Sequence, residues 1–200
     1  MNTRSYDHGG RIMREPTERD VKKDIVLEQC FNCMAEKGIE GISVKDFSKA
    51  TGMSASSLYY WFKDKDEIVL DSVRWGLDKN VNAIFDFAFK HTDNLNKLAK
   101  GIIQIAQDRK LEFRLIFQIA TSPQYGEKVR QLADELDNLY IRYTEALSHK
   151  MKVAFDILYP YVSWVVSVFI DCIIWEDWTK FEREMKVIID LIKAGGKSHE

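Results

Sequence analysis

The sequence predicts an all-α protein of about nine helices. Apolar residues recur every three or four positions along most of the 200 residues, and no stretch shows the sustained alternation of a β-strand. Helix caps and glycines lie close together between residues 42 and 68, which indicates short helices joined by tight turns. A hydrophobic content of 46% is enough for a packed core. We therefore expect an N-terminal three-helix helix-turn-helix domain followed by a larger helical domain.

Capping residues predict the first three helices. The first helix should end at Gly38, where a glycine can close the last turn. Gly52 tolerates a positive φ, so it can form the tight turn between the second helix and a third helix over residues 55–61. The N-terminal caps of these helices are Thr17 with Asp20, Ser43 with Asp46, and Ser54.

Six further helices follow from apolar spacing and from the breaks between apolar runs. Asp64 and Glu67 can cap a helix that runs to Phe89. Ser122 and Pro123 suit the start of another helix, because proline is favoured at the first helical position. The other predicted helices cover about 95–106, 111–120, a segment that Pro160 starts or kinks, and 178–194, which Gly195 and Gly196 close.

The third helix combines small residues with hydrogen-bond donors. Ala55, Ser56 and Ser57 would allow the backbone to approach another surface closely. Tyr59, Tyr60 and Lys65 can donate hydrogen bonds to phosphate oxygens. A plainer interpretation, that such residues form a buried stripe, is the one we favour for Leu58 and Phe62 from their helical spacing. The pattern suits a helix that enters the major groove of DNA.

Residues 25–73 resemble the DNA-binding domain of the TetR family of bacterial repressors. The matching features are Gly38, Ser43-Val44, Gly52, Leu58-Tyr59 followed by Phe62, and Lys65 before an acidic pair. The resemblance implies that Val44 and Lys45 lie near the DNA backbone, and that Ala55, whose side chain offers only apolar contact, faces bases beside two serines. The predicted DNA-binding residues are Val44, Lys45, Ser54, Ala55, Ser56, Ser57, Tyr59, Tyr60 and Lys65.

Composition narrows the class of protein further. A net charge of −2 gives no overall basic excess, so DNA binding must depend on clustered cations such as Lys45, Lys49, Lys63 and Lys65. Three cysteines do not form a disulfide framework, which favours the cytoplasm. We interpret Cys30 and Cys33, despite their CxxC spacing, as buried small side chains. No metal site, cofactor or catalytic constellation is indicated, so we do not expect an enzyme.

The chain is expected to divide into three parts. Residues 1–16 should form a mobile arm with three arginines, which either is simply solvated or reaches a minor groove. Residues 17–68 should form the helix-turn-helix domain. Residues 69–200 should form a helical domain that binds an effector and dimerises. The arginines of the arm are Arg4, Arg11 and Arg14.

The apolar stretch from Phe155 to Trp175 indicates a second copy of the chain as a partner. Asp156, Pro160 and Asp171 interrupt this stretch, so we expect a buried helix and no membrane span. A helix that is apolar on nearly every side must be covered on every side. One face can meet neighbouring helices, and the other can meet its copy in a homodimer. The TetR resemblance implies that this helix and the last helix form the dimer interface.

The remaining helices could enclose a binding site for a small apolar effector. We therefore expect a ligand-responsive transcriptional repressor that binds a palindromic DNA operator as a dimer and releases it when the effector binds. The alternative is an α-helical protein-interaction module that does not bind DNA. The predicted effector-binding residues, which could also be plain core, are Phe113, Arg114, Phe117, Gln118, Tyr143, Trp164 and Asp171.

Overall fold

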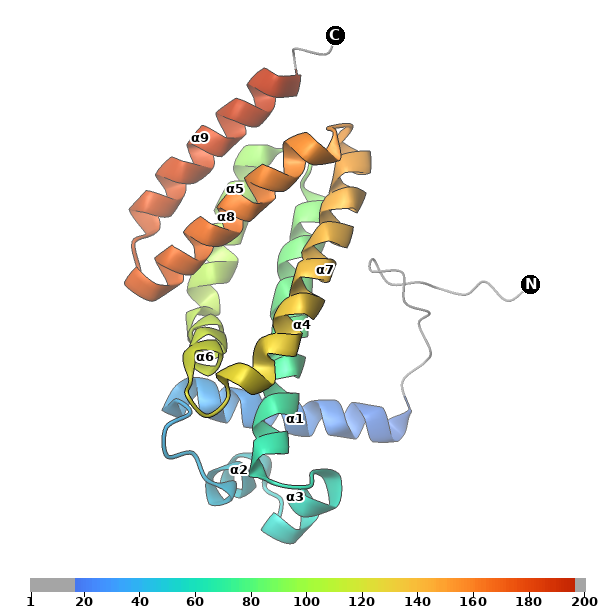
Figure 1. The fold of residues 1–200 in the computed structure, drawn as a ribbon, viewed down its shortest axis with the longest axis vertical. Helices are drawn as coiled ribbons and strands as arrows, with labels where there is room; N and C mark the ends of the chain where they lie inside the picture. Colours follow the sequence, from blue (N-terminus) through green and yellow to red (C-terminus); the bar gives the residue numbers. More distant parts are fainter. Residues whose placement is uncertain (1–16, 197–200) are drawn as a thin grey trace, which may run out of the picture. The chain divides into compact units, whose positions relative to one another are not determined.

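The structure is a computed structural model that describes residues 17–196, and the predicted N-terminal arm lies outside the described residues. The described part is all-α, as predicted, and its nine helices are drawn in Figure 1. The helices are α1 (Glu18–Lys37), α2 (Val44–Thr51), α3 (Ala55–Trp61), α4 (Lys65–Lys90), α5 (Leu95–Asp108), α6 (Lys110–Thr121), α7 (Gly126–Met151), α8 (Phe155–Trp175) and α9 (Trp178–Gly196).

The chain forms two compact units. Within the described residues, we call 17–81 with Leu111–Asp134 the head unit, and Asn82–Lys110 with 135–196 the body unit. The head unit holds α1, α2 and α3, the first part of α4, nearly all of α6 and the start of α7. The compact unit around the predicted helix-turn-helix therefore also contains residues 111–134, which the sequence did not associate with it.

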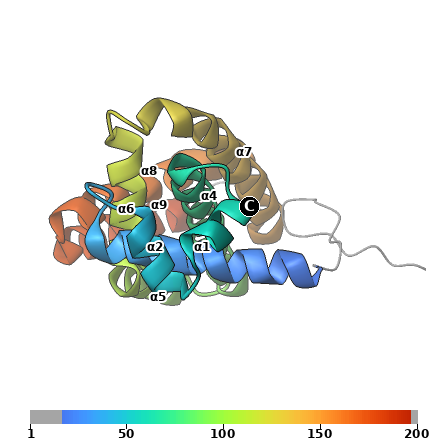
Figure 2. The same ribbon diagram turned by 90° about the horizontal axis from the view of Figure 1, so that it is seen from below.

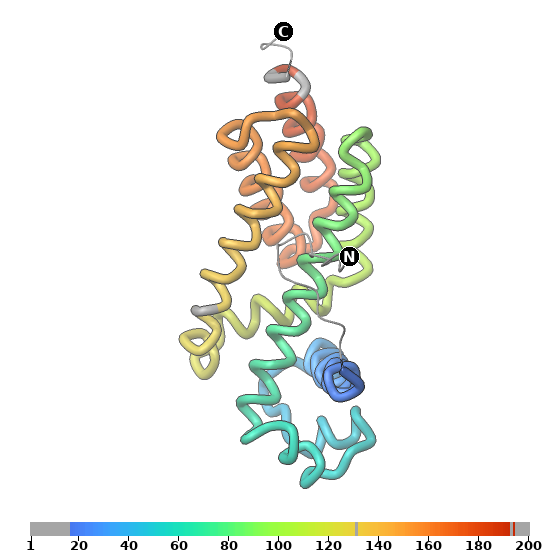
Figure 3. Tube along the Cα trace, turned by 90° about the vertical axis from the view of Figure 1, so that its right-hand side faces the viewer, coloured from blue at the N-terminus to red at the C-terminus, as the bar shows by residue number. Residues whose placement is uncertain are grey.

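The caps of the first three helices are confirmed. Thr17 and Ser43 each form a capping box with the acid three residues later, and the Ser54 hydroxyl accepts a hydrogen bond from the Ser57 N–H at 3.1 Å. Gly52 adopts a left-handed conformation with φ of 67°, which ends α2 and turns the chain towards α3. Figures 2 and 3 show how the chain passes from α1 through α2 and α3 into α4.

Gly76 allows close packing inside the head unit. A Cβ atom at this position would lie 2.2 Å from Cε2 of Phe31, so only a glycine lets the Phe31 ring rest on the α4 backbone. The ring is buried and meets Trp75 edge-on, with 6.1 Å between the centroids. Cys30 and Cys33 are free and buried in the same core, which confirms their interpretation as small core side chains.

In the body unit α9 lies beside both α8 and α5 (Figure 1). Among the helices of residues 17–196, α8 alone is long and apolar enough to pass a composition test for a membrane span. Only 28% of its most apolar window is buried within the chain. Trp175 at its end is 75% exposed, and Val187 and Leu191 on α9 are also exposed. Much of the apolar surface of these two helices therefore remains uncovered in a single chain.

Two helices begin at other residues than the sequence indicated. The helix expected from Pro123 has its regular part only from Gly126, although the Ser122 hydroxyl accepts the N–H groups of Gln124 and Tyr125, as a capping side chain does. Of the two roles expected for Pro160, starting or kinking its helix, the first is excluded, because α8 begins five residues earlier at Phe155 and contains Pro160 in its second turn. A proline at this place has no N–H, so the helix lacks one main-chain hydrogen bond there.

Candidate nucleic-acid interface

The helix α3 exposes one side and buries the other. Leu58 and Phe62 are buried in the head core, as their spacing predicted. Tyr59 is 48% exposed and Tyr60 is 75% exposed. Two bulky aromatic side chains with hydroxyl groups therefore stand in solvent on a short helix, where they can donate hydrogen bonds to an approaching phosphate.

The start of α3 is narrow and rich in hydroxyl groups. Ala55 and Ser56 are exposed and Ser57 is half-buried. The Ser54 hydroxyl lies 2.8 Å from the hydroxyls of both Ser56 and Ser57. These short side chains leave the α3 backbone accessible, which is what insertion of a helix N-terminus into a major groove requires.

The start of α2 supplies a second group of predicted contacts. Lys45 is exposed and Val44 is half-buried. Asp46 in the same turn accepts hydrogen bonds from the Lys37 ammonium at 2.5 Å and from the Ser43 backbone N–H at 3.0 Å. Lys37 and Ser43 hold the pKa of Asp46 well below its usual range. The Asp46 carboxylate therefore caps α2 and pairs with Lys37. Its negative charge, which lies next to Lys45 in the sequence, is balanced by Lys37.

Lys65 in the first turn of α4 is half-buried. Its ammonium donates a hydrogen bond to the Ile42 carbonyl at 3.2 Å, which fixes the position of the side chain. An ammonium has three donors, so two donors are left for other partners such as phosphate oxygens. Lys65 is therefore a positioned cation at the α3–α4 corner, and Lys63 in that corner is exposed.

Sequence reasoning missed a further cation beside α3. The Arg19 guanidinium lies 5.5 Å from the centre of the Trp61 ring, in cation–π contact, although 42 positions separate the two residues. This contact places an exposed arginine from the first turn of α1 beside the last residue of α3. Neither residue belongs to a local motif, so no periodicity or cap could have indicated the pairing.

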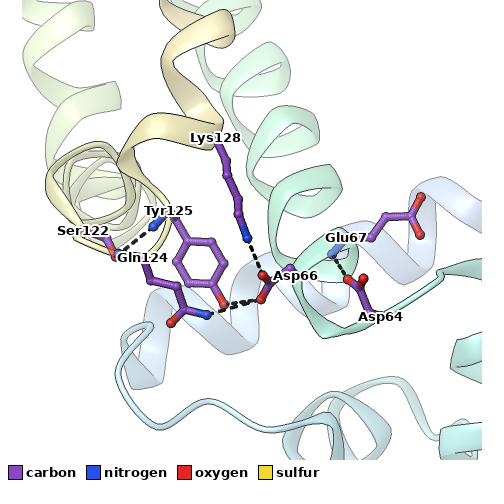
Figure 4. Close-up of polar contacts among 7 residues, drawn as sticks. All are labelled: Asp64, Asp66, Glu67, Ser122, Gln124, Tyr125 and Lys128. Atoms are coloured by element: carbon purple, nitrogen blue, oxygen red, sulfur yellow. Dashed lines mark hydrogen bonds and ion pairs between the residues drawn. The ribbon is translucent and has the colours of Figure 1, made fainter.

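A polar cluster at the start of α4 was missed for the same reason. The Asp66 carboxylate accepts hydrogen bonds from the Tyr125 hydroxyl at 3.1 Å and the Gln124 amide at 3.3 Å, and it pairs with the Lys128 ammonium at 2.5 Å (Figure 4). Its partners lie 58 to 62 positions along the chain: Gln124 and Tyr125 in the connection between α6 and α7, and Lys128 in the first turn of α7.

The predicted effector-binding residues divide between the two units. In the body unit Tyr143 stacks on Phe85, with 4.2 Å between centroids, and donates a hydrogen bond to the Asn82 side chain at 2.6 Å. Asp171 pairs with Lys180 of α9 within the same chain. Phe113 is buried, whereas Gln118 is exposed. Four of the predicted residues belong to the head unit (Phe113, Arg114, Phe117 and Gln118), and three belong to the body unit (Tyr143, Trp164 and Asp171).

Within residues 17–196 no three histidine, cysteine or acidic side chains come together in a way that could hold a metal ion. Burial raises the pKa of the Cys30 thiol to about 12, so this thiol stays protonated at neutral pH. A cysteine binds a metal as the thiolate, so Cys30 is poorly suited to be a ligand. The exposed side chains of α2 and α3 include hydroxyl, ammonium and small apolar groups.

Parts of the chain are similar to known bacterial regulatory proteins. Residues 26–71 match the family model described as bacterial regulatory proteins, tetR family. The chain is 29% identical over 97 residues to the biofilm operon icaADBC HTH-type negative transcriptional regulator IcaR of Staphylococcus epidermidis, covering 48% of this chain and 46% of that protein. IcaR of Staphylococcus aureus strain Newman is 25% identical over 136 residues, which cover 64% and 73% of the two chains. The match thus spans about half of the first relative.

Solved structures share the fold at low sequence identity. A Rhodococcus sp. protein assigned to the TetR family aligns with a TM-score of 0.61 at 17% identity, covering 88% of this chain and 98% of that one. A TetR-like transcriptional regulator from Rhodococcus sp. RHA1 aligns with a TM-score of 0.55 at 14% identity, covering 90% and 96%. At this level of identity the likeness establishes the arrangement of helices and nothing further.

Proposed function

Because the chain belongs to the TetR family of bacterial regulatory proteins, we propose that it is a transcriptional repressor that binds duplex DNA through α3. The observation that carries the proposal is the exposed side of α3, where short side chains at its start precede two solvent-facing tyrosines. Lys65 at the α3–α4 corner supplies a positioned cation. The matched relatives IcaR are named as negative transcriptional regulators, which supports repression.

The proposed roles of the residues follow from their placement. Ala55, Ser56 and Ser57 would face base edges, with Ala55 limited to apolar contact such as a thymine methyl. Tyr59, Tyr60 and Lys65 would bind phosphates, as would Lys45 at the start of α2. The remaining members of the proposed interface are Val44, which opens α2, and Ser54, which caps α3.

The salt dependence of DNA binding tests this proposal. A duplex selected by the protein from a random-sequence pool would be titrated at several salt concentrations, with fluorescence anisotropy as the readout. We expect the affinity to fall steeply as salt rises, and Lys65→Ala to reduce the slope of log affinity against log salt by about one unit, because one phosphate contact is lost. Failure to select any sequence would favour the alternative, a helical module that binds another protein.

We propose further that the repressor is a homodimer joined through α8 and α9. Both helices expose apolar side chains, and Trp175 is the most exposed of them. An uncovered apolar surface of this kind marks an interaction site, and a twofold dimer would present two α3 helices to a palindromic operator. In this proposal a second copy of the chain covers the apolar side chains of α8, so no membrane or cofactor is needed to cover them. With three free, buried cysteines, the cytoplasm is a suitable compartment.

Size measurement by light scattering tests the dimer. Trp175→Arg should shift the protein from dimer towards monomer, because a charge would be buried at the interface without a partner. Ile141→Arg is the matched control, since Ile141 is an exposed apolar residue of α7 that lies on neither α8 nor α9. Equal masses for wild type and the Trp175 variant would place the interface elsewhere.

Control by a small apolar effector completes the proposal. The aromatic residues of the body unit support it, because Tyr143 and Phe85 form a stacked pair with a polar handle at Asn82. The effector needs to change operator affinity only fivefold to about 150-fold, the usual range of coupling between two sites. Mass spectrometry of small molecules that copurify with the protein tests for such a guest. Of the predicted effector contacts, Tyr143, Trp164 and Asp171 belong to the body unit, and Phe113, Arg114, Phe117 and Gln118 belong to the head unit.

A further inference from the structure

The first turn of α4 is held by residues outside the helix-turn-helix. Asp66 is the second residue of α4, and its carboxylate accepts hydrogen bonds from two residues of the α6–α7 connection and one residue in the first turn of α7 (Figure 4). We call Asp66 and its three partners, Gln124, Tyr125 and Lys128, the Asp66 clamp. All four residues belong to the head unit. The clamp therefore joins two segments of one compact unit that are about sixty positions apart in sequence.

Tyr125 is built into the head core. Its side chain is 2% exposed and packs with apolar residues of α1, α4 and α6. The Ser122 hydroxyl accepts the Tyr125 N–H at 3.4 Å and the Gln124 N–H at 3.2 Å, which fixes the turn that carries both side chains. A buried hydroxyl without a partner costs free energy, so the bond to Asp66 satisfies the Tyr125 hydroxyl in the position that the buried ring gives it.

The protonation states of the clamp agree with its hydrogen bonds. Burial, followed by the neighbouring Asp66 carboxylate, raises the pKa of Tyr125 to about 12. The Lys128 ammonium, assisted by Tyr125, holds the pKa of Asp66 below its usual value. At neutral pH the tyrosine therefore donates and the carboxylate accepts.

The same turn of α4 carries a residue of the proposed DNA interface. Lys65 precedes Asp66 and donates to the Ile42 carbonyl of the head. Asp64 caps the turn by accepting the Glu67 N–H at 2.9 Å, and Glu67 accepts the Lys63 N–H of the α3–α4 corner. Consecutive residues of a helix move together, so a displacement of Asp66 displaces Lys65 and the corner that ends α3.

We propose that the Asp66 clamp is a positioning device for DNA binding. In this inference Tyr125 and Lys128 do not touch DNA. They fix the first turn of α4, and through it the α3–α4 corner, in the arrangement that meets the operator. This inference rests on the proposed function. It means that residues 111–134, which belong to the head unit but lie outside the matched family domain, contribute to operator affinity.

Two variants of the full-length protein test the clamp. Tyr125→Phe removes one hydroxyl and keeps the buried ring, and Lys128→Met removes the cation and keeps much of the side-chain volume. Each should weaken binding to the duplex selected by the wild type by about twofold to thirtyfold, the usual range for coupling through a packed network. The slope of log affinity against log salt should stay unchanged, because no phosphate contact is lost. Arg130→Met is the matched control and should have no effect, since Arg130 is an exposed cation of α7 that pairs with Glu127.

Three outcomes separate the possible explanations. Wild-type affinity in both variants would overturn the clamp while leaving the proposed function intact. A Lys128→Met slope that is reduced by one unit, as expected for Lys65→Ala, would show that Lys128 binds a phosphate itself and would also overturn it. A wild type that selects no DNA sequence would overturn both proposals. The concentration of active protein is determined for each variant by stoichiometric titration. If Lys128→Met does not fold, the affinity of Tyr125→Phe is sufficient to test the proposal.

Discussion

Replacing Gly76 by alanine should destabilise the head unit by about 2 kcal/mol. The added Cβ would lie 2.2, 2.4 and 2.5 Å from three carbons of the Phe31 ring, whereas carbon atoms in contact are normally about 3.5–4.0 Å apart. The ring would have to move by more than 1 Å, and it is only 1% exposed and in edge contact with Trp75. Overpacking a core in this way typically costs about 1–3 kcal/mol.

The net effect of Gly76→Ala is the overpacking cost minus the gain in helix propensity. Alanine is more favourable than glycine in a helix interior by about 1 kcal/mol. Because the overlap involves three ring atoms, we take the upper end of the overpacking range, about 3 kcal/mol, which leaves about 2 kcal/mol net. For a chain of this size the midpoint of thermal unfolding should fall by roughly 4–8 °C.

Thermal and urea unfolding followed by circular dichroism measure this change. The matched control repeats Gly76→Ala in a Phe31→Leu background, where the smaller side chain removes most of the overlap. There the substitution should cost little, so the two changes should be clearly non-additive. A Gly76→Ala protein as stable as the wild type would refute the close packing of Phe31 on α4.

Two further predictions concern the caps of the head unit. Ser54→Ala should destabilise α3 by about 1 kcal/mol, because the Ser57 N–H loses its partner, and faster amide hydrogen exchange in α3 measures this change. Asp46→Asn should lower the unfolding midpoint at neutral pH, because Asp46 pairs with Lys37 and caps α2. The native pKa of Asp46 is lowered, so its contribution is fully present above the unfolded pKa of about 4 and disappears as pH falls towards the native pKa. Unfolding curves between pH 7 and pH 2 should therefore converge for the two proteins, and a constant difference would contradict the assignment.

Local signals made the head helices predictable from sequence. The capping boxes at Thr17 and Ser43 depend on residues three positions apart, and the bounds of α3 follow from Ser54. Such motifs satisfy backbone N–H groups with nearby side chains, so they work with little help from the rest of the fold. The same is true of Leu58 and Phe62, whose burial follows from helical spacing.

Contacts between distant segments were not predictable in this way. The residues after Ser122-Pro123 carry a helix-start signal, but nothing in their local pattern indicates that Tyr125 is buried and donates a hydrogen bond to Asp66. The pairing of Arg19 with Trp61 is a similar case. Each joins residues that are 42 or 59 positions apart, and periodicity carries no information at that range. The predicted DNA-binding residues lie on one short segment, whereas the residues that hold this segment in place are distributed along the chain.

The burial of all three cysteines also has a practical consequence. Cys30, Cys33 and Cys172 are buried, and burial raises the pKa of each thiol, so few thiolates exist at neutral pH. A maleimide dye should therefore leave the native thiols unmodified. A single cysteine introduced at the exposed Tyr60 position would then accept one fluorophore per chain. In the proposed homodimer, energy transfer between the two labelled chains would report the distance between the two α3 helices in solution.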